Sequence, residues 1–90
     1  MKIETFEQTV SDQLQRLGGT VHHTITPETR GYTVTLSIYP YDINVSKFYT
    51  ESDVNLHSTQ LIRTQVTNLY RCLTQKVLNK LLGEGVLNVL

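Results

Sequence analysis

The sequence predicts an α+β fold: a two-layer domain with an N-terminal helix, a three- or four-stranded antiparallel sheet and a long C-terminal helix. Apolar residues recur at helical spacing over residues 3–17 and again over residues 58–82, whereas between them apolar and polar residues alternate. Because each element must bury its apolar side, both helices are expected on the apolar face of one sheet. We expect a single domain over residues 1–85, followed by an apolar C-terminal tail at residues 86–90.

The N-terminal helix is predicted by a stripe of apolar residues spaced three, four, four and three apart: Ile3, Phe6, Val10, Leu14 and Leu17. Asp12 and Arg16 are four residues apart, in the order that favours an ion pair along a helix. Gly18 and Gly19 are expected to end the helix, since glycine readily adopts the backbone conformation of a helix C-terminus.

The middle of the chain is expected to form antiparallel strands. From residue 20 the apolar period is two, with Val21, His23 and Ile25 facing one way. A turn at residues 27–31 separates this run from a second alternating run at residues 32–39, so the two are predicted to form a hairpin. Pro40 either ends the second strand or places it at a sheet edge. Residues 43–49 are expected to form a third strand, and residues 54–57 form either a short fourth strand or a lead-in to the last helix.

The C-terminal helix is the longest element, with an apolar stripe made by Ile62, Val66, Leu69, Leu73 and Val77. Ser58 is the expected N-cap, and Gly83 is expected to close the helix in a left-handed conformation. At about 1.5 Å per residue the helix reaches roughly 37 Å, which is long for so small a chain. It carries four basic residues and no acid, but on a helical wheel these bases do not share one face.

Composition narrows the class of protein. The formal net charge is zero, which gives no general attraction to nucleic acid or to an anionic membrane. No apolar run approaches the roughly 20 residues that span a bilayer, and no signal-peptide pattern begins the chain, so we expect a cytoplasmic protein without a membrane partner. The lone Cys72 cannot form an internal disulfide, which fits a reducing compartment.

The sequence gives little support to catalysis. His22 and His23 are adjacent on a strand, so they point to opposite faces and cannot chelate one metal together. The sequence contains neither a nucleophile elbow nor a phosphate-binding loop, and its carboxylates are scattered. Cys72 within a helix is typical of a packing residue. We therefore expect no catalytic residue, no metal and no cofactor, and hence a protein that is not an enzyme.

One hypothesis is a small binding or accessory protein that acts on a protein partner and self-associates as a homodimer. It rests on the long helix, its low-charge polar face and the apolar tail, because under-charged surfaces with exposed apolar segments often form interfaces. Compact chains of this kind are common among viral and mobile-element accessory proteins. The expected interface residues are Tyr39, Thr67, Val86, Leu87, Val89 and Leu90.

The alternative hypothesis is RNA binding. The order helix–three strands–helix resembles that of double-stranded RNA-binding domains, in which the second helix opens with a lysine cluster; here residues 58–63 supply only Arg63. In this hypothesis dimerisation gathers the basic residues of the two long helices, with those of the strand region, into one RNA-binding surface formed by Arg30, Lys47, Arg63, Arg71, Lys76 and Lys80. The aromatic residues of the strand region stack on nucleotides in this hypothesis, or else belong to the core and the sheet edge.

Overall fold

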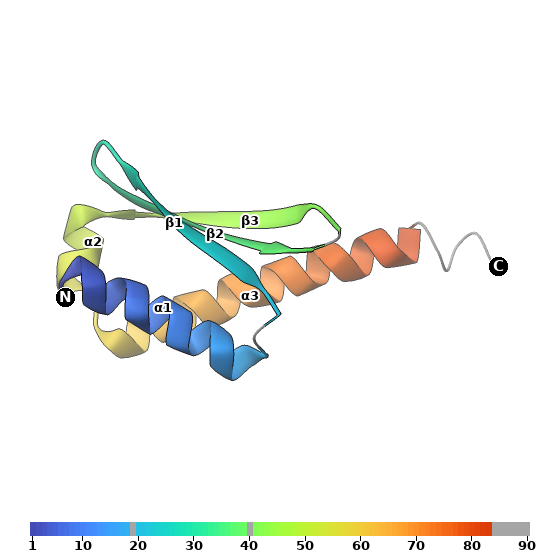
Figure 1. Ribbon diagram of the computed structural model, residues 1–90, viewed down its shortest axis with the longest axis horizontal. Helices are drawn as coiled ribbons and strands as arrows, with labels where there is room; N and C mark the ends of the chain where they lie inside the picture. The colour runs from blue at the N-terminus through green and yellow to red at the C-terminus, as the bar shows by residue number, and fades with distance from the viewer. Residues whose placement is uncertain (19, 40, 84–90) are drawn as a thin grey trace.

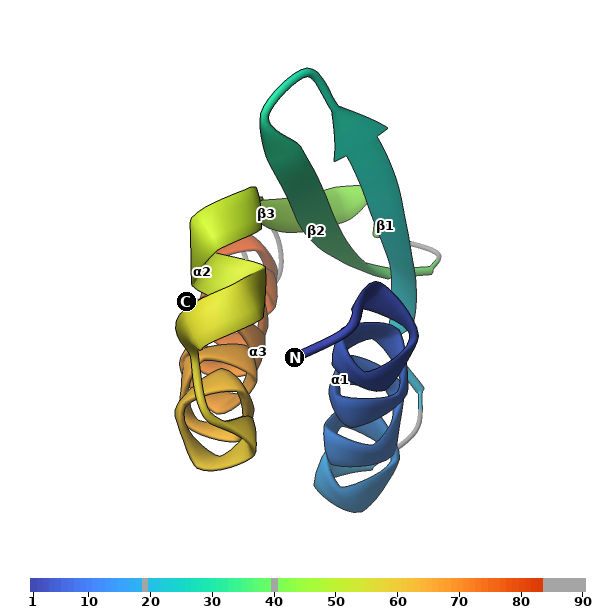
Figure 2. The same ribbon diagram turned by 90° about the vertical axis from the view of Figure 1, so that its left-hand side faces the viewer.

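The computed structural model describes residues 1–18, 20–39 and 41–83. Within them the chain forms α1 (Ile3–Leu17), β1 (His22–Glu28), β2 (Gly31–Ile38), β3 (Ile43–Thr50), α2 (Glu51–Leu56) and α3 (Thr59–Leu81). The strands make one antiparallel sheet in the order β1-β2-β3, and α1 and α3 lie side by side against one of its faces (Figures 1 and 2). The predicted two-layer α+β architecture is confirmed. The tail at residues 86–90 and the boundary at residue 85 fall outside the described residues.

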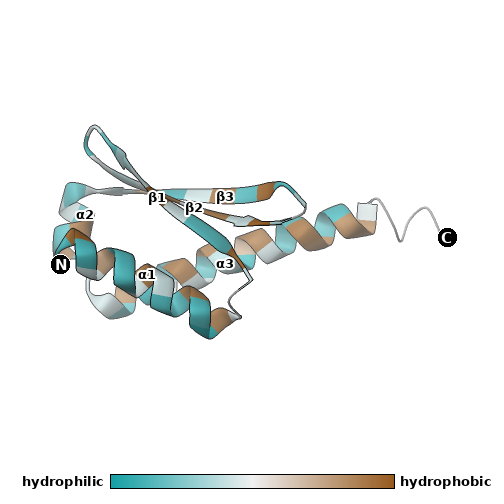
Figure 3. Ribbon diagram, in the orientation of Figure 1, coloured by the Kyte–Doolittle hydropathy of each residue, from teal (hydrophilic) through white to brown (hydrophobic). Residues whose placement is uncertain are grey.

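The core lies between the sheet and the two long helices. Tyr49 is the largest of its fully buried side chains, and the ring of Phe6 meets it edge-on with the ring centroids 5.0 Å apart. Burial of each such side chain contributes about 1.5–3 kcal/mol. The predicted stripes and inward strand residues supply the other members except Val54, which comes from α2: Val10, Leu14, Val34, Leu36, Val45, Val54, Ile62, Val66 and Leu73. Along α3 the apolar residues recur as bands (Figure 3).

The outer face of the sheet is rich in hydroxyl groups, and its charged residue is Glu28, whose Oε1 accepts a hydrogen bond from Thr33 Oγ1 at 3.3 Å. Thr24 of β1 is paired with Thr35 of β2, which is paired with Ser46 of β3. The hydroxyls of Thr35 and Ser46 are hydrogen-bonded at 3.0 Å. The polar residues of the alternating strand pattern therefore lie on this face, as the sequence predicts.

Helix α1 ends at Gly18, which has a φ of 139° that an L side chain rarely adopts. The expected ion pair between Asp12 and Arg16 is not formed among the described residues. Instead the Asp12 carboxylate accepts a hydrogen bond from Gln8 Nε2 at 2.7 Å, and Arg16 lies on the side of α1 that faces α3.

The β1–β2 turn is tighter than predicted. Strand β1 continues through Pro27 to Glu28, which pairs with Gly31 and leaves only residues 29–30 in the turn. An edge strand tolerates proline because its outward N–H groups are not needed by the ladder. Glycine is required at position 31, since a Cβ there would lie 2.0 Å from the carbonyl oxygen of Tyr49.

Residues 54–57 do not form a fourth strand; residues 54–56 belong to helix α2. The helix begins with a capping box, in which Asp53 N donates to Thr50 Oγ1 and Thr50 N donates to the Asp53 carboxylate, both at 3.0 Å. The backbone hydrogen bond from Thr50 is the main cause that lowers the pKa of Asp53. The ammonium group of Met1 donates to the carbonyl oxygens of Val54 and Asn55, each at 2.8 Å, near the end of α2.

Helix α3 begins as predicted, with Leu61 N donating to Ser58 Oγ at 3.1 Å. Its 23 residues correspond to about 34 Å, and the helix continues well past the end of α1 (Figure 1). The expected left-handed closure at Gly83 is wrong. Gly83 has no positive φ, and Leu82 before it has a right-handed helical backbone (φ −64°, ψ −40°).

Candidate anion-binding groove

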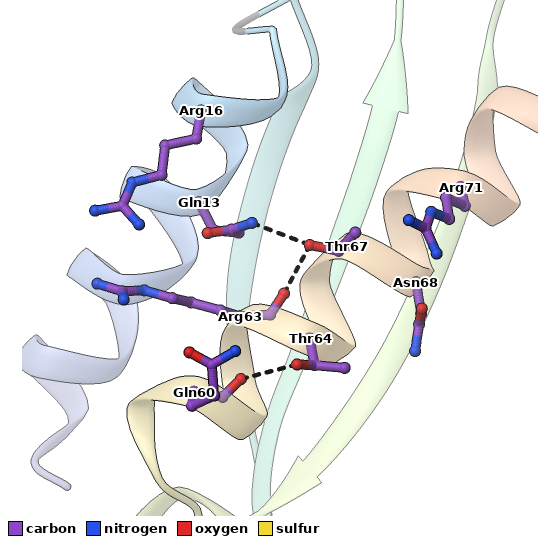
Figure 4. A pocket seen from close by; sticks show the side chains of 8 residues that line it. All are labelled: Gln13, Arg16, Gln60, Arg63, Thr64, Thr67, Asn68 and Arg71. Atoms are coloured by element: carbon purple, nitrogen blue, oxygen red, sulfur yellow. Dashed lines mark hydrogen bonds between the residues drawn. The ribbon is translucent and has the colours of Figure 1, made fainter.

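A groove of about 380 Å³ runs between α1 and α3 (Figure 4). We call it the arginine groove. Its lining residues are Gln13 and Arg16 from α1, and Gln60, Arg63, Thr64, Thr67, Asn68 and Arg71 from α3. Every one of these side chains is polar, which distinguishes the groove from the apolar core on the other side of α3.

The helical repeat explains why these side chains line one groove. The lining residues of α3 recur at steps of three and four, so they share the side of the helix opposite its buried stripe. Gln13 and Arg16 are three apart on α1 and therefore neighbours on its surface. Gln13 Nε2 donates to Thr67 Oγ1 at 3.0 Å, and the Thr67 hydroxyl donates to the carbonyl oxygen of Arg63 at 2.9 Å. The first of these bonds joins the two helices, and the second anchors the Thr67 hydroxyl to the backbone of α3.

The groove is electropositive because Arg16, Arg63 and Arg71 contribute three guanidinium groups and the other lining residues include no carboxylate. Arg63 extends from α3 toward α1, where Arg16 also lies, and Arg71 lies on the other side of Thr67 (Figure 4). Guanidinium groups bind phosphate and carboxylate in a bidentate manner, and arginine remains charged at all physiological pH values. The arrangement is therefore suited to a ligand with several negative charges.

Arg63 has a further property that points to an anionic ligand. Its Nε is shielded from solvent and has no hydrogen-bond partner within the described part of the chain. A buried donor without an acceptor costs about 1–3 kcal/mol. A ligand oxygen that reached Nε would satisfy this donor.

The six basic residues predicted from the sequence do not lie together within the single chain. Arg63 and Arg71 lie in the groove, joined by Arg16, which was not predicted as a site residue. By contrast, Lys76 Nζ donates to the carbonyl oxygen of Asn44 at 3.4 Å, and Lys80 Nζ donates to that of Tyr41 at 3.3 Å. These two lysines therefore face the sheet rather than the groove.

Lys47 and Arg30 are also separate from the groove. Lys47 lies on the inner face of β3, with its Nζ 5.3 Å from the centroid of the Tyr49 ring. Arg30 lies in the β1–β2 turn and lines a shallow hollow together with Phe48. The predicted basic residues are thus divided between the groove (Arg63 and Arg71), the inner face of β3 (Lys47), the β2–β3 hairpin (Lys76 and Lys80) and the β1–β2 turn (Arg30).

The aromatic residues make no common stacking surface. Tyr49 is 1% exposed, and burial, assisted by the charge of Asp53, raises its pKa to about 12. Phe48 is 46% exposed on the outer face of the sheet, and Tyr39 is 83% exposed beyond the end of β2. Tyr32 and Tyr41 are half-buried. None of these rings lines the arginine groove.

The predicted interface residues are also dispersed. Thr67 lies in the arginine groove, hydrogen-bonded to both helices, whereas Tyr39 is exposed near the β2–β3 turn. The remaining four, Val86, Leu87, Val89 and Leu90, fall outside the described residues.

The other chemically active side chains do not converge. His57 Nε2 is 3.8 Å from Asp53 Oδ1, at the end of α2, and Cys72 is an exposed residue of α3. Across residues 1–18, 20–39 and 41–83, no three histidine, cysteine or acidic side chains are grouped as metal ligands. In the same part of the chain no helix combines the length and the apolar character needed to cross a bilayer.

No protein-family model, curated protein sequence or solved structure matches this chain.

One feature of the sequence indicates that Arg16 belongs to the same site as Arg63. It follows Gln13 by three residues, so an arginine and an amide share one side of α1, as Arg63 and Gln60 do on α3. The Asp12–Arg16 spacing instead favours an ion pair within α1.

Proposed function

We propose that this protein is a non-enzymatic RNA-binding protein and that the arginine groove binds the phosphate backbone of double-stranded RNA. The observation that carries the proposal is the convergence of Arg16, Arg63 and Arg71 on one groove whose other lining residues are uncharged. A chain with no net charge has no general affinity for nucleic acid, so local concentration of positive charge supplies the attraction.

The lining residues favour contacts to the backbone over contacts to bases. Single-stranded nucleic acid is usually bound by aromatic side chains on which bases stack, and the groove has none. RNA duplexes are bound mainly through their shape, their phosphates and their 2′-hydroxyl groups. Gln13, Gln60 and Asn68 carry both donors and acceptors, which suits a hydroxyl that also donates and accepts. The presence of these amides beside the arginines favours RNA over DNA.

The length of the groove suits more than one phosphate. Arg63 and Arg71 are eight residues apart on α3, which corresponds to about 12 Å along the helix axis, and Arg16 stands on the opposite wall. A polymeric anion can therefore contact all three guanidinium groups together. About three neutralised phosphates imply modest affinity that falls steeply with salt.

The experiment is fluorescence anisotropy with an RNA duplex of about 16 base pairs, a DNA duplex of the same sequence and the single RNA strand. We expect the RNA duplex to bind most tightly. The triple variant Arg16→Gln, Arg63→Gln, Arg71→Gln should lose this binding. The matched control, Lys47→Gln, Lys76→Gln, Lys80→Gln, removes the same number of charges outside the groove and should retain it.

Two results would contradict the proposal, once circular dichroism shows that both triple variants are folded. Equal loss of affinity in the two variants would mean that net charge, and not the groove, governs binding. Preference for the single strand over the duplex would show that the ligand is recognised through its bases.

A further inference from the structure

The two edges of the sheet are differently protected. Within the described residues β1 and β3 are the edge strands, and each leaves one row of backbone N–H and C=O groups without a ladder partner. Paired residues in an antiparallel ladder alternate between hydrogen-bonded and non-hydrogen-bonded pairs. Because Glu28 and Gly31 close a two-residue turn, they form a hydrogen-bonded pair, and so do Thr26 with Thr33 and Thr24 with Thr35. The backbone groups of His23 and Ile25 therefore point away from β2.

The edge formed by β3 carries two features that discourage further pairing. Lys47 points inward from this strand and is half-buried over the Tyr49 ring, and inward-pointing charges are a known protection of edge strands. By the same alternation the carbonyl of Asn44 points outward, and Lys76 Nζ donates to it at 3.4 Å. Lysine side chains thus protect this edge from a neighbouring strand.

The edge formed by β1 has no comparable protection over residues 22–26. None of these residues is an acid, a lysine or an arginine, and the closest helix–sheet packing involves β2 and β3 instead. Pro27, which lacks an N–H, limits the free edge at one end. A short, regular and uncharged row of unpaired backbone groups is suited to pairing with another extended strand.

We propose that β1 is the interface through which two copies of this chain form a homodimer. The strands pair antiparallel about a two-fold axis, with Thr24 of one copy opposite Thr24 of the second copy. In this register His23 of each copy exchanges backbone hydrogen bonds with Ile25 of the other, so the outward groups on both edges are satisfied. The two three-stranded sheets become one continuous sheet.

A second copy is the occupant because this segment is complementary to itself. A two-fold axis makes the same surface serve both sides of an interface, and an antiparallel strand pair has this symmetry. Residues 22–26 include no acid, lysine or arginine whose charge would oppose the approach of a second copy. The hydroxyl-rich outer faces join into one surface, and the buried faces bring the partly buried Ile25 of one copy beside His23 of the other.

The contact is small, because it adds one strand pair. Interfaces that bury less than about 1,200 Å² in total are at the weak end of specific association. We therefore expect a dissociation constant between about 10 μM and 1 mM. The dimer carries two arginine grooves, but its formation does not depend on what those grooves bind.

The experiment is light scattering during size-exclusion chromatography over that concentration range, with charge-swapped variants. The mass of the parent protein should rise from that of the monomer toward twice that value. Thr24→Lys and Thr24→Glu each place like charges directly opposite one another, so each variant alone should remain a monomer. An equimolar mixture of the two should regain the dimer, because lysine then faces glutamate. Ser46→Lys, an equivalent change on the same face at the other edge, should dimerise like the parent.

Amide hydrogen exchange gives a second readout. The amides of His23 and Ile25 should exchange several-fold more slowly as the protein concentration rises. A parent protein that stays monomeric at about 1 mM would overturn the proposal. Undiminished dimerisation of both Thr24 variants, with no protection of the His23 and Ile25 amides, would place the interface elsewhere and would also overturn it.

Discussion

Replacing Arg63 and Arg71 by glutamine removes two of the three charges of the arginine groove. Both side chains line the groove from α3, and Gln keeps most of the length and polarity of each side chain without its charge. The tie between the helices should survive, because Gln13 donates to Thr67, and Thr67 donates to the backbone carbonyl of Arg63 rather than to its side chain. The substitution therefore tests phosphate binding with little change in the fold.

The magnitude follows from the number of phosphates neutralised. Each contact contributes a slope of about −0.9 to the logarithm of affinity against the logarithm of salt concentration on a duplex. Three arginines give about −2.7, so raising salt from about 50 to 200 mM lowers affinity about 40-fold. With Arg16 alone the slope is about −0.9, and the same rise in salt lowers affinity only about 3.5-fold.

The assay is anisotropy of a labelled RNA duplex over this salt range, with the parent protein, Arg63→Gln/Arg71→Gln and the control Lys76→Gln/Lys80→Gln. The control should retain the parental slope, since both lysine ammonium groups donate to backbone carbonyls of the β2–β3 hairpin. An arginine variant with the parental slope would refute the reasoning. So would a lysine variant whose slope falls by the same amount, because the positions of the charges would then be irrelevant.

Three further predictions concern stability. Burial raises the pKa of Tyr49 to about 12 in the folded protein, above the usual 10.0. The buried neutral phenol therefore makes its full contribution to the free energy of unfolding below pH 10, and this contribution is lost as the pH rises toward 12. Urea unfolding should show a loss of up to about 3 kcal/mol over that range, which Tyr49→Phe should remove. Gly31→Ala should destabilise the protein by about 1–3 kcal/mol, because the Cβ of the new alanine would collide with the carbonyl oxygen of Tyr49. Gly83→Ala, which has open space, should change thermal stability by less than about 0.5 kcal/mol. Thr50→Ala should cost about 1 kcal/mol in chemical denaturation by removing the cap of α2, and a cost near zero would contradict that role.

The local pattern of the sequence was enough to predict most of the fold. The stripes that include Phe6 and Ile62 have the period of a helix, and the alternation around Val34 has that of a strand, because each period follows from backbone geometry within a few residues. Helix α2 was missed although its signal is equally local. Thr50 and Asp53 have the spacing of a capping box, but the alternation of residues 54–57 fits either a short strand or a lead-in to the last helix.

The sequence by itself determined that Arg63 and Arg71 are on a helix and that the chain has no net charge. Only the tertiary structure decided which charges act together. The packing of α1 against α3 brings Arg16 to the groove from a position 47 residues before Arg63 in the chain, and the sheet takes Lys76 and Lys80 away from it. The physical reason is that helical periodicity fixes which side of an element a residue occupies. Which other element that side meets depends on how the whole core is buried.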